Sequence, residues 1–427
     1  MFPGLVQSFF TDLPSGFEDA PATWAWVSYK DPSVAVLSGP FNRSVFDAPF
    51  ESVTSDFSLQ QANDFLNTTH FVAYDERFFG IIGPNATITH IQKLTYQTHE
   101  APCYNPNTKE LLFVEWGPPG GDDGVHTWQY LLDTKTNELR KITTSPPTVN
   151  LHGCVFYNDF YYGVTDGSAN ETGALVKIDP VTFEKTILLN NYYQQPFAGF
   201  NDLEIDPDGN FWLTDSKSGA VRPKAFTSIH PPTNAFRSHH QHNMTLTKGI
   251  QGRDIIPFTP PTNPTLYFVN ATTMAPKPVH VTTGNANGVA IAHSSTSTYT
   301  LYLPDTGVSV FKPVSLKDPY GNRGLFAYDV SPSGGGGVLT NGRLLNNPIS
   351  YFYDGVRVSA GGWVFASAGD GVDVISPTDG VTLGTIRVGG GGNLAVAVGL
   401  GEHELWVVGR GGVWHVDGVK EKLRRDW

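Results

Sequence analysis

The chain has 427 residues, a formal net charge of −12, 40% hydrophobic residues and 12% aromatic residues. So much apolar side chain can bury a large core, which excludes a disordered chain. The 45 glycines and 31 prolines are typical of short strands joined by turns, and they exclude a coiled coil or a helical bundle. The acidic balance argues against binding to a phosphate backbone. No apolar stretch approaches the ~20 residues of a membrane-spanning helix, so we expect neither a nucleic-acid nor a membrane partner.

The sequence is compatible with two cellular compartments. The opening segment, 1–10, lacks the basic and apolar regions of a signal peptide. Six Asn-x-Ser/Thr sequons favour a secreted glycoprotein, and a cytoplasmic protein remains the alternative; they begin at Asn42, Asn67, Asn85, Asn170, Asn243 and Asn270. The two cysteines, Cys103 and Cys154, match no metal motif, and we expect buried thiols rather than a disulfide.

In chain order, residues 1–70 are predicted to form an irregular N-terminal extension packed on the main domain. Residues 71–427 are predicted to form one catalytic domain. The segment 71–93 alternates apolar and polar residues, and we expect it to supply outer strands that pair with the last repeat.

One pattern then recurs six times: a polar residue, an alternating strand, a turn and a second apolar strand. The copies begin at Glu100, His152, Asn201, Asn287, Asp354 and Asn393. The clearest copy turns at Asp208-Gly209, a tight-hairpin signal. An unadorned propeller blade takes ~40–50 residues, and the spacing of the copies fits this with insertions in the third and fourth. The fold class predicted is therefore all-β, a six-bladed β-propeller.

The residues that open the repeats carry the chemistry. Each innermost strand of a propeller starts at the central channel, so equivalent positions point to one place. Four of these positions hold oxygen donors: Glu100, Asn201, Asn287 and Asp354. Two carboxylates and two amides suit Ca²⁺, with Mg²⁺ or Mn²⁺ as alternatives. Zn²⁺ is a less favoured alternative because thiolate and clear imidazole ligands are missing. Each residue alone could equally be a turn residue.

At this point the sequence resembles a known family. The segments Glu100-Ala-Pro, Asn201-Asp202-Leu, Asn287-Gly288-Val and Asp354-Gly355-Val look like those of the senescence marker protein/gluconolactonase/regucalcin propellers. Within that family the chain is most similar to fungal lactonohydrolases, which open aldonate and pantoyl lactones. The resemblance covers about residues 71–410. It implies a catalytic divalent metal on the channel axis, with Glu100, Asn201, Asn287 and Asp354 as its ligands.

One residue departs from that pattern. His152 opens the second repeat where Asn or Arg is expected, which looks more like the related paraoxonase propellers. Histidine titrates near neutrality, so His152 is a candidate general base, with the carboxylate of Asp354 as the alternative. The alternative is a purely structural role, in which His152 is a hydrogen-bonded histidine of a turn. His99 and Asp202 are candidate substrate-binding residues, although alternation favours an orienting role for His99, and Asp202 could instead hold Asn201.

The function predicted is a metal-dependent lactone hydrolase, in which an activated water opens a small-molecule lactone to a hydroxy acid. The alternatives are an esterase or phosphotriesterase, a non-hydrolytic biosynthetic enzyme on the same metal site, and a binding propeller with a structural ion. No Gly-x-Ser-x-Gly elbow is present, which disfavours a serine hydrolase. Aromatic residues such as Trp116, Phe197, Phe200 and Tyr353 suggest a pocket larger than a sugar lactone needs. Substrate and oligomeric state stay open.

Overall fold

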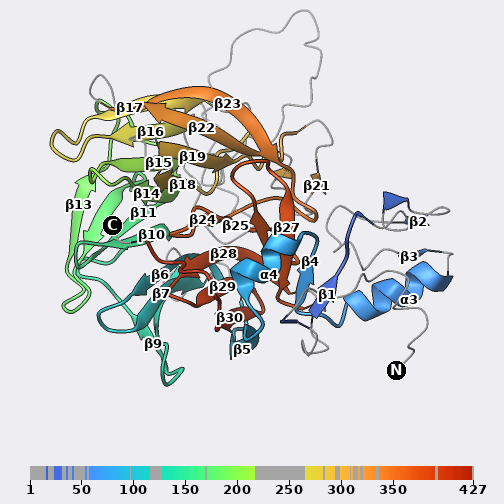
Figure 1. Ribbon diagram of the computed structural model, residues 1–427. Helices are drawn as coiled ribbons and strands as arrows, with labels where there is room; N and C mark the ends of the chain where they lie inside the picture. The colour runs from blue at the N-terminus through green and yellow to red at the C-terminus, as the bar shows by residue number, and fades with distance from the viewer. Residues whose placement is uncertain are drawn as a thin grey trace, which may run out of the picture.

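The computed structural model contains six β-sheets arranged as the blades of a propeller (Figure 1). This confirms the all-β, six-bladed prediction. The part of the chain that the structure describes comprises residues 16–17, 24–30, 35–36, 41–42, 53–54, 57–96, 98–115, 127–168, 171–216, 265–281, 284–293, 299–307, 309–310, 316–317, 321–331, 336–389 and 393–425.

Each blade is built from four antiparallel strands, of which the first lies innermost. The first blade has strands β6 (Thr98–Asn105), β7 (Glu110–Glu115), β8 (Trp128–Asp133) and β9 (Leu139–Ile142). The second has β10 (Leu151–Tyr157), β11 (Phe160–Thr165), β12 (Leu175–Ile178) and β13 (Lys185–Leu189). The third has β14 (Phe200–Ile205), β15 (Phe211–Asp215), β16 (Thr265–Val269) and β17 (Pro276–Val281).

The remaining blades follow the same order. The fourth has strands β18 (Ala290–His293), β19 (Tyr299–Pro304), β22 (Leu325–Ser331) and β23 (Val338–Asn346). The fifth has β24 (Val356–Val358), β25 (Val364–Ser367), β26 (Gly371–Ile375) and β27 (Thr382–Arg387). The sixth has β28 (Leu394–Leu400), β29 (Leu405–Arg410), β30 (Gly412–Asp417) and β5 (Thr87–Lys93).

The sixth blade closes the ring with strands from both halves of the chain. Its outermost strand, β5, precedes the first blade in sequence and pairs antiparallel with β30, with Ile88 opposite Val416. The predicted pairing of the segment 71–93 with the last repeat is thereby confirmed for β5. The other strand in that segment, β4 (Phe71–Ala73), pairs instead with β27 of the fifth blade. Closure of the ring leaves only short strand edges exposed.

The hairpin of the third blade illustrates how local sequence sets the strand pattern. The Asp206 carboxylate accepts the backbone N–H groups of Asp208 and Asn210 at 3.0 and 2.9 Å. Its second oxygen accepts the indole N–H of Trp212 at 3.1 Å. One side chain therefore fixes the turn predicted at Asp208-Gly209 and anchors the strand that follows it.

The apolar core lies between neighbouring blades rather than within a single one. Trp212 and Val289, for example, pack at the interface of the third and fourth blades. The aromatic residues expected near a pocket belong to these cores: Phe197 and Phe200 pack between the second and third blades, and Tyr353 between the fourth and fifth. All three are at most 1% exposed, so the suggestion that they enlarge a substrate pocket is wrong for them. The fourth aromatic residue of that prediction, Trp116, lies outside the described residues.

Part of the N-terminal segment packs against the fifth blade. Strand β1 (Trp24–Trp26) pairs parallel with β4, which extends that sheet outward. Helix α4 (Glu76–Ile82) begins at the N-cap residue Asp75 and buries its apolar side against the same blade. Figure 1 shows helix α3 (Phe57–Leu66) to one side of the ring.

Four strands of two residues each form two small sheets outside the blades. Strands β2 (Phe41–Asn42) and β3 (Val53–Thr54) form one two-stranded sheet. Strands β20 (Ser309–Val310) and β21 (Leu316–Lys317) form another, inserted between β19 and β22 of the fourth blade.

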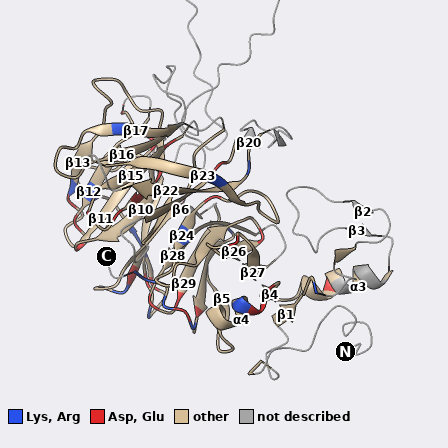
Figure 2. Cartoon of the chain, turned by 45° about the horizontal axis from the view of Figure 1, so that its top comes forward, with Lys and Arg blue, Asp and Glu red and all other residues tan. Residues whose placement is uncertain are grey.

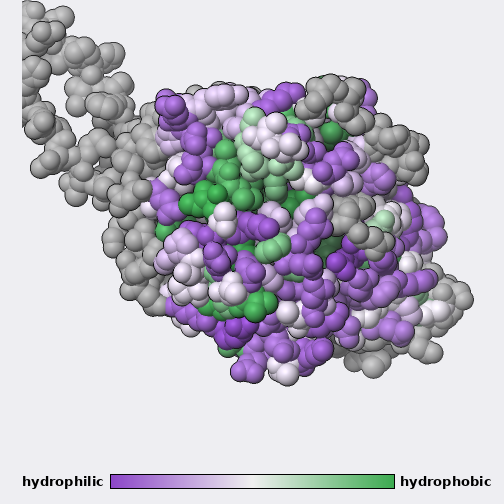
Figure 3. Space-filling model, turned by 90° about the vertical axis from the view of Figure 1, so that its left-hand side faces the viewer, coloured by the Kyte–Doolittle hydropathy of each residue, from purple (hydrophilic) through white to green (hydrophobic). Residues whose placement is uncertain are grey.

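The outer surface is mainly polar. Acidic and basic residues are interspersed along the blades (Figure 2). The side that carries β13 in Figure 1 faces the viewer in Figure 3, where hydrophobic residues form local patches among polar ones. Exposed apolar residues of the second blade and its following loop include Val181, Ile187 and Tyr193. No described helix is long and apolar enough to cross a membrane.

Candidate metal centre at the central channel

The four predicted metal ligands lie where innermost strands begin. Glu100 and Asn201 belong to β6 and β14. Asn287 and Asp354 directly precede β18 and β24, respectively. All four side chains belong to buried residues with at most 6% exposure. Burial of four polar side chains at equivalent positions of four blades requires compensating contacts, because desolvation of polar groups costs free energy.

Contacts between neighbouring blades connect these positions around the channel. His152 lies between Glu100 and Asn201: its Nδ1 is 3.9 Å from Glu100 Oε1 and 3.0 Å from the Asn201 carbonyl oxygen. Further round, the Thr214 hydroxyl donates to the Asn287 carbonyl oxygen at 2.6 Å. The Asn287 and Asp354 positions are joined in turn, because the N–H of Gly288 donates to the Asp354 carbonyl oxygen at 3.2 Å.

Glycine follows three of the opening residues because the innermost strands approach one another closely. A Cβ at position 153 would lie 2.6 Å from Asp202 Cα in the next blade, and one at 288 would collide with the Asp354 carbonyl oxygen. Real Cβ atoms do not tolerate such contacts. The His-Gly and Asn-Gly pairs therefore mark close packing around the channel at these positions, not the tight turns that such pairs usually signal.

Strand pairing is irregular at three of the residues that open the repeats. The register of β6 with β7 shifts on both sides of Glu100. The same happens between Leu151 and Cys154 in β10 and between Phe200 and Leu203 in β14. β-Bulges re-aim side chains and are common beside functional sites. The innermost strands of the first three blades are thus distorted at the residues that open the repeats.

The donor atoms suit a hard divalent cation. Asn201 Oδ1 and Asn287 Oδ1 are buried and accept no hydrogen bond from the residues that the structure describes. The Asn287 amide is oriented by its own Nδ2, which donates to the Thr306 hydroxyl at 3.4 Å. Buried polar atoms are normally satisfied, so buried acceptors without donors are suited to hold a cation. Together with the carboxylates of Glu100 and Asp354, buried at the equivalent positions of the first and fifth blades, the set fits Ca²⁺ or a similar ion.

His152 is buried and fixed in one tautomer when neutral. Its Nδ1 lies 3.0 Å from a carbonyl oxygen, which can only accept, so Nδ1 carries the hydrogen. The other ring nitrogen, Nε2, then holds the lone pair. It lies 3.9 Å from Oδ2 of Asp166, a buried carboxylate that follows β11. The ring is therefore held between two neighbouring blades, with its basic nitrogen toward Asp166.

Asp166 was not predicted, although the sequence contains a signal for it. The dipeptide Thr165-Asp166 ends the second strand of its blade, as Thr214-Asp215 does in the third. The Asp215 carboxylate accepts the N–H groups of Ala198 and Gly199 at 3.2 and 2.8 Å, and so holds the segment that leads to Asn201. Burial raises the pKa of Asp215 to about 7, against the opposing effect of these two bonds.

Asp202 forms an ion pair across the channel. Its two oxygens lie 2.8 and 3.2 Å from Nη1 and Nη2 of Arg357, which belongs to β24. They also accept the N–H groups of Leu203 and Val289. Arg357 donates further to the carbonyl oxygens of Val289 and Cys154. The pair connects four blades, and the sequence alone did not indicate Arg357.

This arrangement gives Asp202 a positioning role next to Asn201. Its carboxylate is occupied by donors of the protein, and the residue is 2% exposed. A substrate contact by Asp202 stays a prediction. The side chain of His99 lies outside the described part of the chain. Cys103 and Cys154, on β6 and β10, are buried free thiols as expected, and burial is the main cause that raises the pKa of Cys103.

The geometry defines a class: a six-bladed propeller that buries oxygen-bearing side chains where four of its innermost strands begin. No family model matches the chain. Two lactonohydrolases of Aspergillus oryzae are similar to the chain in sequence. OryL is 28% identical over 394 residues, and the match covers 89% of this chain and 82% of OryL. OryH is 27% identical over 407 residues, covering 84% and 82%.

Solved structures show the same fold. A gluconolactonase of Xanthomonas campestris superposes with a TM-score of 0.59 at 16% identity, covering 81% of this chain and 94% of that one. A luciferin-regenerating enzyme superposes with a TM-score of 0.52 at 16% identity, covering 80% and 98%. The chain is therefore similar in sequence to two lactonohydrolases and shares its fold with a gluconolactonase, in line with the resemblance noted from its sequence motifs.

Proposed function

We propose that the protein is a metal-dependent lactone hydrolase, with Ca²⁺ held in the channel by Glu100, Asn201, Asn287 and Asp354. The observation that carries this is the pair of buried amide oxygens, on Asn201 and Asn287, that no described donor satisfies. The similarity over most of the chain to two proteins named lactonohydrolases supports the reaction class. Mg²⁺, Mn²⁺ and Zn²⁺ remain alternative ions.

The residues around this site can supply the proton chemistry of ester cleavage. A cation bound there would polarise the lactone carbonyl and stabilise the developing oxyanion. His152 takes a proton from the attacking water at Nε2, because Nδ1 is committed to the Asn201 carbonyl oxygen. Asp166, 3.9 Å from Nε2, stabilises the imidazolium that results. The ring oxygen then leaves with a proton, and the product is a hydroxy acid.

Asp354 is the second candidate for the base, since its carboxylate belongs to the same layer. Two features favour His152. Its neutral form has one defined lone pair, whereas Asp354 is needed as a charged ligand in the proposed cation site. His152 is also fixed from both sides, by the Asn201 carbonyl oxygen and by packing against a buried carboxylate.

Acid release measured in a pH-stat tests the proposal directly. A panel would run from sugar lactones to aromatic and macrocyclic lactones, each assayed alone, with a chelator, and with Ca²⁺ restored. We expect release that the chelator abolishes and Ca²⁺ restores. Aryl esters and a phosphotriester serve as controls for the other hydrolase classes. A protein that binds Ca²⁺ but releases acid from no lactone would overturn the proposal.

A further inference from the structure

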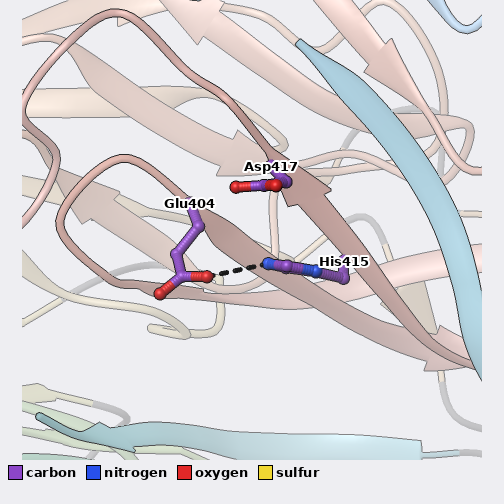
Figure 4. Close-up of side chains that lie close together, drawn as sticks. All are labelled: Glu404, His415 and Asp417. Carbon is purple, nitrogen blue, oxygen red and sulfur yellow. Dashed lines mark hydrogen bonds and ion pairs between the residues drawn. The ribbon is translucent and has the colours of Figure 1, made fainter. Parts of the chain in front are cut away.

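A second group of metal-ligating side chains lies on the sixth blade, away from the innermost strands. Glu404 directly precedes β29, whereas His415 and Asp417 lie on β30. One ligand atom from each lies within 4.8 Å of the others. Figure 4 shows the His415 ring pointing to the Glu404 carboxylate, with Asp417 beside them. All three residues are at least partly exposed, so an ion can reach them from solvent.

Strand register explains why these three side chains meet. Leu405 pairs with Val416, and Trp406 pairs with His415. Continued by one residue, this register places Glu404 opposite Asp417 on the same face as the Trp406–His415 pair. Two carboxylates in directly opposite positions repel each other. A cation bound between them removes this repulsion.

The imidazole between the carboxylates is already oriented for binding. The ring of His415 stacks on the buried indole of Trp406, with centroids 5.4 Å apart and planes 8° apart. Its Nε2 lies 2.9 Å from Glu404 Oε2. The N–H of Gly418 donates to Asp417 Oδ1 at 2.8 Å, which orients that carboxylate. A metal ion at Nε2 would take the place of the hydrogen between His415 and Glu404, and the neutral ring would then carry its hydrogen on Nδ1.

We propose that Glu404, His415 and Asp417 form a second metal site that binds Zn²⁺ or a similar transition ion. One imidazole, two carboxylates and a water complete four-fold coordination of Zn²⁺. Imidazole is a ligand that Zn²⁺ accepts readily and Ca²⁺ does not need. The site therefore differs in preference from the all-oxygen channel site, and the two can be filled independently.

The position of this site indicates its effect. Strand β30 is the strand that pairs with β5 and so joins the two ends of the propeller. An ion held by Glu404, His415 and Asp417 ties β29 to β30 in that blade. Because it binds the folded chain and not the unfolded one, it stabilises the closed ring.

Zinc titration of the full chain in excess Ca²⁺ tests the proposal, since Ca²⁺ occupies the channel site throughout. Calorimetry measures affinity and stoichiometry, and the visible absorption of Co²⁺ reports tetrahedral nitrogen and oxygen ligands. The variants are Asp417→Asn and Glu404→Gln, which keep the side-chain shape and spare the stack of His415 on Trp406. Glu402→Gln is the matched control, because Glu402 is exposed and pairs only with Arg424 among the ion pairs described.

Even residues that only hydrogen-bond to a metal ligand contribute at least about ten-fold to metal affinity. We therefore expect Zn²⁺ affinity to fall at least about ten-fold in Asp417→Asn and in Glu404→Gln. Glu402→Gln should bind like the parent protein. Zn²⁺ should also raise the melting temperature of the parent and of Glu402→Gln, but not of the other two. Histidines elsewhere contribute equally to all variants. Equal Zn²⁺ binding by all four proteins, or none, would overturn the proposal.

Discussion

Two adjacent residues of β14 show opposite ways of burying a polar side chain. The Asp202 carboxylate receives hydrogen bonds from Arg357 and from two backbone N–H groups. The Asn201 amide oxygen receives none from the described residues. Both residues are at most 3% exposed, so the difference does not come from access to water. The channel therefore has a closed layer, in which Asp202 is paired with groups of the protein, and an open layer, in which the amide oxygens of Asn201 and Asn287 accept from no described donor.

The closed layer continues one step further along the same strand. Glu204 lies 2.6 Å from Nη2 of Arg425, near the end of the chain. Arg425 also donates to the carbonyl oxygen of Ile291 in the fourth blade. These charges are paired on burial, as the free energy of desolvation requires. Ion pairs in this layer connect blades that are far apart in sequence.

The largest effect is expected from breaking the closed layer. Arg357→Met leaves the Asp202 carboxylate buried without its cation, and we expect the free energy of unfolding to fall by about 3–5 kcal/mol. Urea denaturation measures it. The double variant Arg357→Met/Asp202→Leu should recover part of the loss, because no unpaired charge remains. A single variant as stable as the parent would show that the pair does not hold the channel.

The next effect concerns His152, which belongs to neither layer alone. Gln at this position keeps an N–H for the Asn201 carbonyl oxygen but cannot accept a proton from water. We expect kcat for lactone hydrolysis to fall about 10²–10⁴-fold, with Ca²⁺ affinity measured by calorimetry nearly unchanged. Normal turnover in His152→Gln would exclude it as the base and leave Asp354 as the candidate.

In the open layer, a substitution should weaken Ca²⁺ binding strongly but change the stability of the metal-free protein little. Asn287→Ala removes a buried acceptor without a donor, so we expect the metal-free protein to lose less than about 1 kcal/mol of stability. Its Ca²⁺ affinity should fall by at least about 10–100-fold, because even the loss of a residue that only hydrogen-bonds to a metal ligand has an effect of this size. Urea denaturation in chelator and Ca²⁺ calorimetry separate the two effects. A strongly destabilised metal-free variant would contradict an open layer.

A third buried carboxylate gives the smallest effect and sharpens the contrast. The Asp373 carboxylate accepts the hydroxyl groups of Thr385 and Tyr353, and burial raises its pKa from 3.8 to about 7 against the opposing effect of these bonds. A folded-state pKa above the unfolded value means that the folded chain holds the proton longer. Its contribution to stability therefore declines as the pH rises from about 4 to 7.

Asp373→Asn removes this dependence while keeping the side-chain shape. Relative to the parent, the variant should be more stable at pH 8 than at pH 5, as measured by urea denaturation in chelator at both values. Asp133→Asn is a useful control, because Asp133 is exposed and backbone hydrogen bonds from Thr136 and Lys135 lower its pKa. Parallel stability curves for the parent and Asp373→Asn would contradict the raised pKa.

Much of this architecture follows from local sequence. Alternating strands and turn residues repeat six times, and closure by the segment before the first repeat follows from the same alternation. These signals depend on residues a few positions apart, which the strand period fixes. Equivalent repeat positions also predicted which polar residues begin the innermost strands, namely Glu100, Asn201, Asn287 and Asp354. The metal site itself, however, stays a proposal.

Tertiary structure alone decided which polar residues are satisfied. Arg357 meets Asp202 across 155 positions of sequence, and Asp166 faces His152 from the neighbouring strand. Phe197 and Phe200, expected near a pocket, pack between blades instead. Hydrophobic period and turn chemistry are local, whereas the pairing of a buried charge depends on which blades face each other. Only the closed ring determines whether a buried oxygen finds a donor within the protein.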